Sequence, residues 1–84
     1  MSSKDALQQI PGIGPSLAQD LRKLGYGAVK DLQNADPEEM YSRLCALCGK
    51  QDPCVLYAFR CAVYFAQPGP HDPEKLKWWY WKDR

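Results

Sequence analysis

The sequence carries no excess of charge of either sign. Its 84 residues hold 11 Lys and Arg against 10 Asp and Glu, a formal net charge of +1. The balance is four basic to three acidic residues over 1–34, three to four over 35–67, and four to three over 68–84. A basic patch or stripe is the electrostatic footprint of many nucleic-acid-binding proteins. Because that footprint is missing, any binding to nucleic acid has to come from local geometry.

Long hydrophobic runs are also missing. The most apolar stretch, CVLYAFRCAVYFA at residues 54–66, has 13 residues and contains Arg60. Spanning a bilayer takes about 20 apolar residues, and the N-terminal MSSKDALQQI has no continuous apolar segment of the secretory-signal type. We therefore expect a soluble, cytoplasmic protein without a membrane partner, whose four cysteines are reduced.

Residues for catalysis are scarce. The chain has one histidine, His71, in the Pro- and Gly-rich segment QPGPH. No Ser-His-Asp or Cys-His set is visible, although proximity of Cys54 and His71 in the fold stays open. The GxG of PGIGP is not a nucleotide-binding fingerprint, because no strand precedes it. We predict a non-catalytic protein without a cofactor.

What the sequence does contain is a regular set of helix start signals. Three Asp-Pro pairs begin at Asp36, Asp52 and Asp72. Asp is a strong N-cap because its carboxylate accepts hydrogen bonds from the free amides of the first turn, and Pro suits the next position, since its missing donor is not needed there. Helices are therefore predicted to begin near residues 37, 53 and 73.

Apolar spacing predicts the remaining elements. No strand pattern is present, so we expect one all-α domain over residues 1–84 with five or six short helices. The stretch 53–66 is apolar nearly all round, which is typical of a buried central helix. The predicted helices lie near residues 6–10, 15–24, 29–32, 37–48, 53–66 and 73–82.

The stretch IPGIGPSLA at residues 10–18 breaks one helix and at once starts another. Gly12 and Gly14 can adopt positive φ and let another backbone approach closely, and Ile13 between them can point into the core. Pro15 begins the next helix, where its absent donor costs nothing. The amides of the turn and of the next helix N-terminus then face outward, which predicts a concave cluster of donors suited to a phosphate.

The segment LQQIPGIGPSLAQDLRKLGYGAVKDL resembles a helix-hairpin-helix motif over about residues 5–33, and GYGAVKDL resembles the continuation seen in competence-regulator C-terminal domains. The residues at the positions expected for the motif are Leu7, Ile10, Pro11, Gly12, Ile13, Gly14, Ala18, Leu21 and Gly25.

The rest of the chain extends the resemblance. DPEEMYSRLCALCGKQDPCVLYAFRCAVYFA and KLKWWYWKDR are similar to the small bacterial "pathogenicity locus" family of helix-hairpin-helix proteins, some of which are labelled mitomycin-resistance proteins. This resemblance implies a SAM-domain-like helical bundle with the hairpin at 5–33, central helices at 36–66 and an aromatic C-terminal helix at 72–84. It implies no settled activity.

In helix-hairpin-helix proteins the hairpin binds DNA through phosphates without reading the sequence. Carried onto this chain, the resemblance implies contacts from the amides of Gly12, Ile13 and Gly14, with Ser16 and Lys23 assisting. Many such proteins grip both strands with two hairpins, whereas this sequence has one good hairpin and few basic residues beside it. The alternatives are a hairpin that contacts a protein and a hairpin that only packs helices.

The four cysteines, spaced C-x2-C-x5-C-x6-C, resemble a zinc-site pattern. Cys54 and Cys61 lie seven residues apart on one predicted helix, a rise of about 10.5 Å, whereas sulfur ligands of one zinc lie roughly 4 Å apart. One ion therefore cannot bind all four. A site formed by Cys45, Cys48, Cys54 and His71 stays open, and the favoured interpretation is that the thiols are small hydrophobic residues of the core.

The C-terminal KLKWWYWKDR places four consecutive aromatic residues among basic ones. In a helix, Trp78 and Trp81 share one face, and Leu76, Trp79 and Tyr80 share another. One face has to pack on the body, and the other is free to stack on bases or to enter a partner's apolar groove. The favoured interpretation is that this helix caps the small core.

Two functional classes therefore remain. The first is a DNA-binding module that grips phosphates through the hairpin, with affinity that falls as salt rises. The second is a protein-interaction adaptor with an exposed apolar or aromatic patch and salt-tolerant binding. A basic rim around residues 12–14 favours the first class, and a neutral or acidic rim favours the second.

Overall fold

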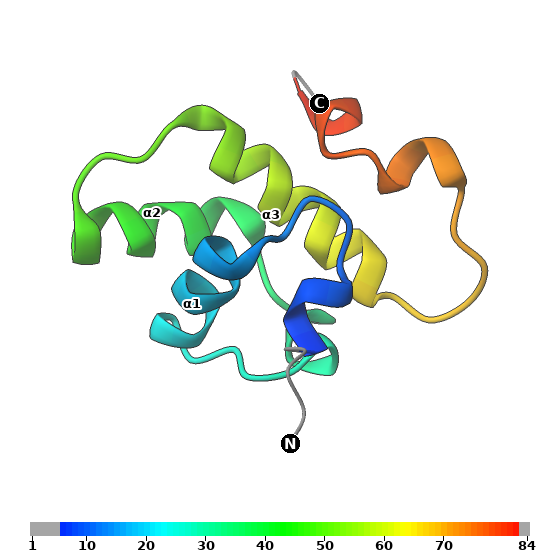
Figure 1. Ribbon diagram of the computed structural model, residues 1–84, viewed down its shortest axis with the longest axis horizontal. Helices are drawn as coiled ribbons and strands as arrows, with labels where there is room; N and C mark the ends of the chain where they lie inside the picture. Colours follow the sequence, from blue (N-terminus) through cyan, green and yellow to red (C-terminus); the bar gives the residue numbers. More distant parts are fainter. Residues whose placement is uncertain (1–5, 83–84) are drawn as a thin grey trace.

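Short helices alternate with tight turns along the chain (Figure 1). The computed structural model describes residues 6–82, and within that range the regular elements are three α-helices and four 3-10 turns, with no strand. The all-α prediction is therefore confirmed. The elements in chain order are η1 (Ala6–Gln9), α1 (Pro15–Lys23), η2 (Val29–Leu32), α2 (Pro37–Cys48), α3 (Pro53–Ala66), η3 (Pro73–Leu76) and η4 (Trp78–Trp81).

The three Asp-Pro pairs begin α2, α3 and η3, as predicted. The carboxylates of Asp36, Asp52 and Asp72 each accept a hydrogen bond from the amide two residues further on, at 2.9, 3.1 and 3.0 Å. Asp52 accepts hydrogen bonds from the backbone amide and the side chain of Cys54, which stabilise its charged form and lower its pKa from the ordinary value. Glycines with positive φ end α1 and α2, Gly25 at +98° and Gly49 at +89°, because this conformation satisfies the last helical carbonyls at little cost.

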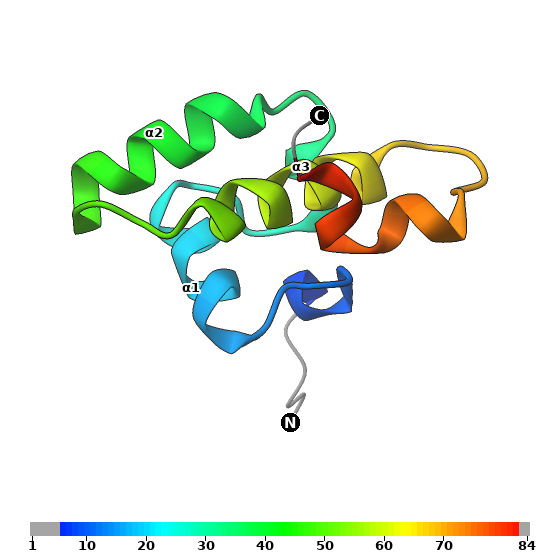
Figure 2. The ribbon, with the colours of Figure 1, turned by 90° about the horizontal axis from the view of Figure 1, so that it is seen from above.

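Helix α3 is the centre of the fold. It packs against α2, η2, η3 and η4, and Figure 2 shows it between α2 on one side and the C-terminal turns on the other. Its buried residues are small except for Phe59, which allows neighbouring elements to approach closely. The prediction of a buried central helix is confirmed. Within residues 6–82, the other buried members of the hydrophobic core are Leu7, Ile10, Ile13, Ala18, Leu21, Leu24, Leu32, Met40 and Leu44.

The prediction of a C-terminal α-helix over 73–82 is wrong. Two 3-10 turns occupy this segment, separated by Lys77 with φ −91° and ψ 124°. In an α-helix the carbonyl of Lys75 accepts from the amide four residues on, but here it accepts from the indole Nε1–H of Trp81 at 2.8 Å. The Trp81 carbonyl in turn accepts from Arg60 of α3 at 2.9 Å. These side-chain bonds hold the segment against α3 in place of helical bonds.

Two smaller expectations also need correction. The first predicted helix forms only as the 3-10 turn η1. Helical spacing predicts that Leu47 shares an apolar stripe with Met40 and Leu44, but Leu47 is 63% exposed, whereas Met40 and Leu44 are buried. None of the helices in residues 6–82 is long and apolar enough to cross a membrane.

Candidate nucleic-acid interface

The predicted phosphate-binding turn connects η1 to α1. The Ile10 amide donates to the Leu7 carbonyl at 3.2 Å, and the Ile13 amide donates to the Ile10 carbonyl at 3.1 Å. All three of these side chains are buried. Ile13 therefore anchors the turn in the core, as predicted. Its amide is engaged inside the turn, so this predicted phosphate donor already has an acceptor.

The two glycines of the turn differ in conformation. Gly12 has φ +86°, as predicted. Gly14 has φ −94° and ψ −173°, so the positive φ predicted for it is wrong. Gly14 is the N-cap of α1, and its carbonyl accepts from the Ala18 amide at 2.9 Å. Extended backbone is the usual conformation at an N-cap.

Three backbone donors remain available at this turn. The amides of Gly12, Gly14 and Ser16 have no hydrogen-bond partner within residues 6–82, and all three residues are exposed. Ser16 lies in the first turn of α1, where the helix dipole adds positive partial charge. Backbone donors of this kind suit an anion such as a phosphate.

Lys23, the other predicted contact, does not lie beside this turn. It is the last residue of α1, seven residues after Ser16, which corresponds to about 10.5 Å along the helix axis. Its side chain is exposed. The structure therefore brings Gly12, Gly14 and Ser16 together in one turn and places Lys23 at the opposite end of α1.

The C-terminal turns pack directly on the hairpin, which the sequence did not indicate. A Cβ atom on Gly12 would meet Cβ of Trp78 at 3.2 Å and its Cδ1 at 3.4 Å. Trp78 in turn packs against the hydrophobic core. In Figure 2 the turn after η1 lies next to η4. Gly12 is thus required both by its positive φ and by this close contact.

Cys61 lies at the same junction, between the hairpin and the C-terminal turns. Its Sγ lies 3.8 Å from the Pro11 carbonyl oxygen and 3.7 Å from the Lys75 carbonyl oxygen, between the hairpin and η3. The side chain is fully buried. Loss of solvent raises the pKa of the thiol to about 11. Cys61 is therefore a structural thiol of the core, as predicted.

The other cysteines do not follow the core-thiol prediction. Cys48 and Cys54 are exposed and Cys45 is half-buried. Sequence spacing could not predict which cysteines are buried and which are exposed, because all four lie on predicted helices that the structure also contains.

The residues of the candidate metal site are not brought together. Cys54 lies at the start of α3, whereas His71 follows its end, where its Nε2 is 2.8 Å from the Gln67 carbonyl oxygen. Cys54 and His71, whose proximity the sequence left open, therefore lie at opposite ends of α3 and are not close. In the part of the chain that the structure describes, no group of three or more His, Cys, Asp or Glu side chains is placed to hold a metal ion.

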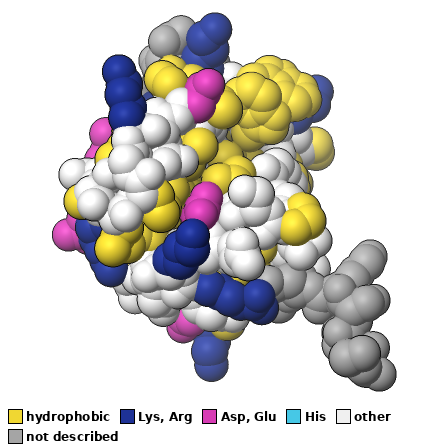
Figure 3. Space-filling model, turned by 60° about the vertical axis from the view of Figure 1, so that its left-hand side comes forward, with side chains coloured by type: hydrophobic (Ala, Val, Ile, Leu, Met, Phe, Trp, Pro, Cys, Tyr) yellow, Lys and Arg dark blue, Asp and Glu magenta, His cyan; other side chains and the backbone are white. Residues whose placement is uncertain are grey.

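A hollow of about 450 Å³ lies between the start of α3 and η4 and adjoins the hairpin through Trp78. Trp79 at its edge is 56% exposed. Figure 3 shows a face on which hydrophobic side chains gather around a depression, with both acidic and basic side chains at its margins. The lining residues are Asp52, Pro53, Cys54, Tyr57, Trp78, Trp79 and Lys82.

Charges around this hollow are mixed. Lys82 and Asp52 both line it. Lys77 lies with its Nζ 5.9 Å from the centroid of the Trp79 ring, and the same Nζ is 3.3 Å from the Glu74 carboxylate. The rim is therefore close to neutral, and Coulombic attraction for a polyanion is weak here.

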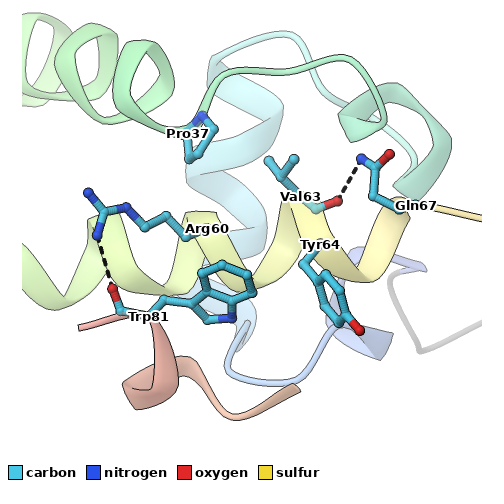
Figure 4. A pocket seen from close by; sticks show the side chains of 6 residues that line it. All are labelled: Pro37, Arg60, Val63, Tyr64, Gln67 and Trp81. Carbon is cyan, nitrogen blue, oxygen red and sulfur yellow. Dashed lines mark hydrogen bonds between the residues drawn. The ribbon is translucent and has the colours of Figure 1, made fainter. Parts of the chain in front are cut away.

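A second cavity, of about 390 Å³, lies between the start of α2, α3 and η4 (Figure 4). Its polar groups are already engaged. Arg60 donates to the Trp81 carbonyl and forms an ion pair with Glu38, and Gln67 donates to the carbonyls of Gln33 and Val63. Its lining residues are Pro37, Arg60, Val63, Tyr64, Gln67 and Trp81.

Tyr57, Asp52 and Lys82 were missing from the predicted site. Asp52 was identified only as a helix cap, and Tyr57 only as part of an apolar helix. The contact between the hairpin and the C-terminal turns, through Gly12 and Trp78, is what brings these residues near the predicted donors. It joins segments more than 60 residues apart in sequence, and no local pattern reports it.

Comparison with known proteins confirms the resemblance inferred from the sequence. The family described as Cdd1, pathogenicity locus, matches residues 2–84. A protein named mitomycin resistance protein McrB, from Streptomyces lavendulae, is 32% identical over 84 residues, which cover 96% of this chain and 76% of that protein. No solved structure matches the chain.

Proposed function

Because the chain belongs to the pathogenicity locus family, whose description states no activity, we propose a function from the geometry of the site. The protein binds the phosphate backbone of DNA, without reading the base sequence, at the turn between η1 and α1. The observation that carries this proposal is the set of three exposed amides, of Gly12, Gly14 and Ser16, without acceptors within residues 6–82 and beside a helix N-terminus.

The architecture supports the same proposal. The turn is held on a buried base by Ile10 and Ile13, so its donors are positioned before any ligand arrives. In this proposal η1, the turn and α1 form a helix-hairpin-helix unit whose first helix is reduced to one 3-10 turn, within a SAM-domain-like bundle. The protein has no catalytic role.

The small net charge of the protein determines how tightly we expect it to bind DNA. With a formal charge of +1 and backbone donors as the main contacts, binding falls in the weak, non-specific range of about 10⁻⁴ to 10⁻⁶ M. One turn contacts few phosphates, so the dependence of affinity on salt is shallow. The slope of log K against log salt for a duplex is about −0.9 for each phosphate neutralised, and we expect a value no steeper than about −2.

The test is an NMR titration of ¹⁵N-labelled protein with a short DNA duplex at low salt. We expect the amide resonances of Gly12, Gly14 and Ser16 to shift, and to return as salt is added. The Ile13 amide, bonded inside the turn, serves as an internal reference and shifts less. Absence of shifts at the three donor amides, in a folded protein, would overturn the proposal.

A matched pair of variants separates the turn from general charge effects. Ser16→Asp places a carboxylate at the donor amides, whereas Ser42→Asp adds the same charge at an exposed position of α2. Asp in a first helical turn is compatible with the helix, and Ser42 is exposed in the middle of α2, where a surface substitution changes stability little, so we expect both variants to fold. We expect Ser16→Asp to abolish the DNA-induced shifts and Ser42→Asp to preserve them.

A second candidate function, protein binding, is favoured by one observation. Trp79 and Leu47 are large hydrophobic residues that stay 56% and 63% exposed. Exposed apolar side chains of this size favour association when they belong to a larger patch. A protein that functions in this way shows no DNA-induced shifts at the donor amides, so the titration described above distinguishes the two functions.

A further inference from the structure

We propose that the hollow between α3 and η4 binds an unpaired nucleobase of a single-stranded nucleic acid whose phosphate lies at the hairpin. This inference rests on the proposed function and names its substrate class. It is carried by the position of the hollow, by its aromatic walls and by the polar groups at its edge.

The position comes from Trp78, which belongs to both sites. Its Cβ would lie 3.2 Å from a Cβ atom built on Gly12, and Trp78 is one of the residues that line the hollow. The turn that carries the free amides of Gly12 and Gly14 is therefore separated from the hollow by one residue, Trp78. A phosphate at the turn places the base of the same strand beside the aromatic walls.

The walls suit a flat ring. Trp78 and Trp79 stand perpendicular, with their ring centroids 5.7 Å apart and an interplanar angle of 89°. A base stacked on one indole meets the edge or face of the other in this corner, and Tyr57 adds a third aromatic surface. Every base has a π-face, so stacking of this kind does not depend on sequence.

The edge groups complement a base better than an aliphatic partner. Lys82 offers donors and the Asp52 carboxylate offers acceptors, matching the acceptors and donors that line the edge of a base. The Asp52 carboxylate also receives the Cys54 amide at 3.1 Å, which fixes its orientation. A helix that buried only apolar side chains in the hollow would leave both charges desolvated, at a high cost.

The occupant has to be single-stranded. Bases in a duplex are paired and stacked, and their faces cannot reach a protein pocket without being flipped out. The near-neutral rim gives a duplex little Coulombic attraction, since Lys82 is opposed by Asp52 and Lys77 by Glu74. Stacking supplies a favourable contact that only an unpaired base can make. We therefore expect a single strand to bind roughly ten times more tightly than a duplex.

The experiment measures fluorescence anisotropy of three end-labelled probes at low salt: a mixed-sequence single strand, the same sequence as a duplex, and an abasic single strand with the same number of phosphates. The variants are Trp79→Ala and, as a matched loss of the other exposed large hydrophobic residue, Leu47→Ala. Both residues are exposed, so both variants are expected to fold, which circular dichroism verifies.

We expect the wild type to bind the single strand roughly ten-fold more tightly than the duplex or the abasic strand. Trp79→Ala should remove this preference and leave duplex binding unchanged, and Leu47→Ala should change neither. Equal binding of the three probes by the wild type, all sensitive to Ser16→Asp, would overturn the inference and leave the proposed function standing. No binding of any probe would overturn both, and would direct the search to a protein partner.

Discussion

Cys61 is the residue at which three parts of the chain meet. Its side chain belongs to α3, and its sulfur lies within 4 Å of carbonyl oxygens from the hairpin and from η3. The site is fully buried, so the neutral thiol fits and a thiolate would have to lose its hydration. The raised pKa of about 11 expresses that cost.

This burial predicts a loss of stability in alkaline solution. Below about pH 9 the thiol is protonated in both the folded and the unfolded chain. Between pH 9.0, the ordinary pKa, and about 11, the unfolded chain ionises and the folded chain does not, so the free energy of unfolding falls as pH rises. At pH 10 the contribution of this thiol to the loss is about 1.4 kcal/mol. Urea unfolding at pH 8 and pH 10 under reducing conditions measures it.

Cys61→Ala is the control for this prediction. Other groups also ionise in this range, among them Tyr41, whose pKa is raised chiefly by burial. They contribute to the alkaline loss in both proteins. We therefore expect the wild type to lose more stability than Cys61→Ala between the two pH values, and equal losses would contradict the buried-thiol interpretation.

At the scale of single residues, local chemistry decided what could be predicted. The Asp36, Asp52 and Asp72 caps were predictable because a cap depends on neighbours two residues away. The environment of each cysteine was not, because Cys54 and Cys61 lie on the same helix and differ only in what packs on them.

At the scale of elements, the two glycines of the hairpin differ in whether their backbone and surroundings tolerate a Cβ atom. Gly12 has a positive φ, and an added Cβ would lie 3.2 Å from Trp78. Gly14 has an extended backbone with no atom within 4 Å of an added Cβ. Gly12→Ala should therefore lower the free energy of unfolding by about 1–3 kcal/mol, with a fall in Tm of roughly 4–8 °C for each kcal/mol.

Gly14→Ala is the matched control on the same turn. The substitution loses about 0.5–1 kcal/mol at the N-cap and gains about 0.4–1 kcal/mol by restricting the unfolded chain, so its Tm should stay within a few degrees of the wild type. Thermal unfolding followed by circular dichroism measures both variants. Equal destabilisation by the two substitutions would mean that the turn has a different backbone conformation or that Trp78 does not contact it.

The elements differ in how far the sequence predicted them. Helices α2 and α3 begin at their Asp-Pro caps, and α2 ends at Gly49, because these signals act within one turn of the chain. The last helix was mispredicted because distant groups shape it. Arg60 donates to a carbonyl that lies 21 residues further along the chain, and the indole N–H of Trp81 donates to the carbonyl of Lys75. The donors at Gly12 and Gly14 were predictable from the turn, and the aromatic hollow beside them was not.

At the scale of the whole molecule, the C-terminal turns close the fold. Trp78 contacts the hairpin at Gly12, Trp81 packs on Tyr64 with ring centroids 5.6 Å apart, and the Lys75 carbonyl faces the buried sulfur of Cys61. A chain of 84 residues has one small core and a correspondingly small margin of stability. The segment that supplies the candidate base-binding surface is thus also part of the core.

Deleting the last ten residues should therefore unfold the protein. The deletion removes η4 together with the second half of η3, which exposes the apolar surface of α3 and leaves Arg60 without the carbonyl that it binds. We expect no cooperative thermal transition in the truncated chain. Trp79→Ala, which alters the same segment at an exposed residue, is the control and should keep a Tm within a few degrees of the wild type. A truncated chain with the Tm of the full chain would mean that the C-terminal turns only rest on a complete core, and that their aromatic side chains are free to serve binding alone.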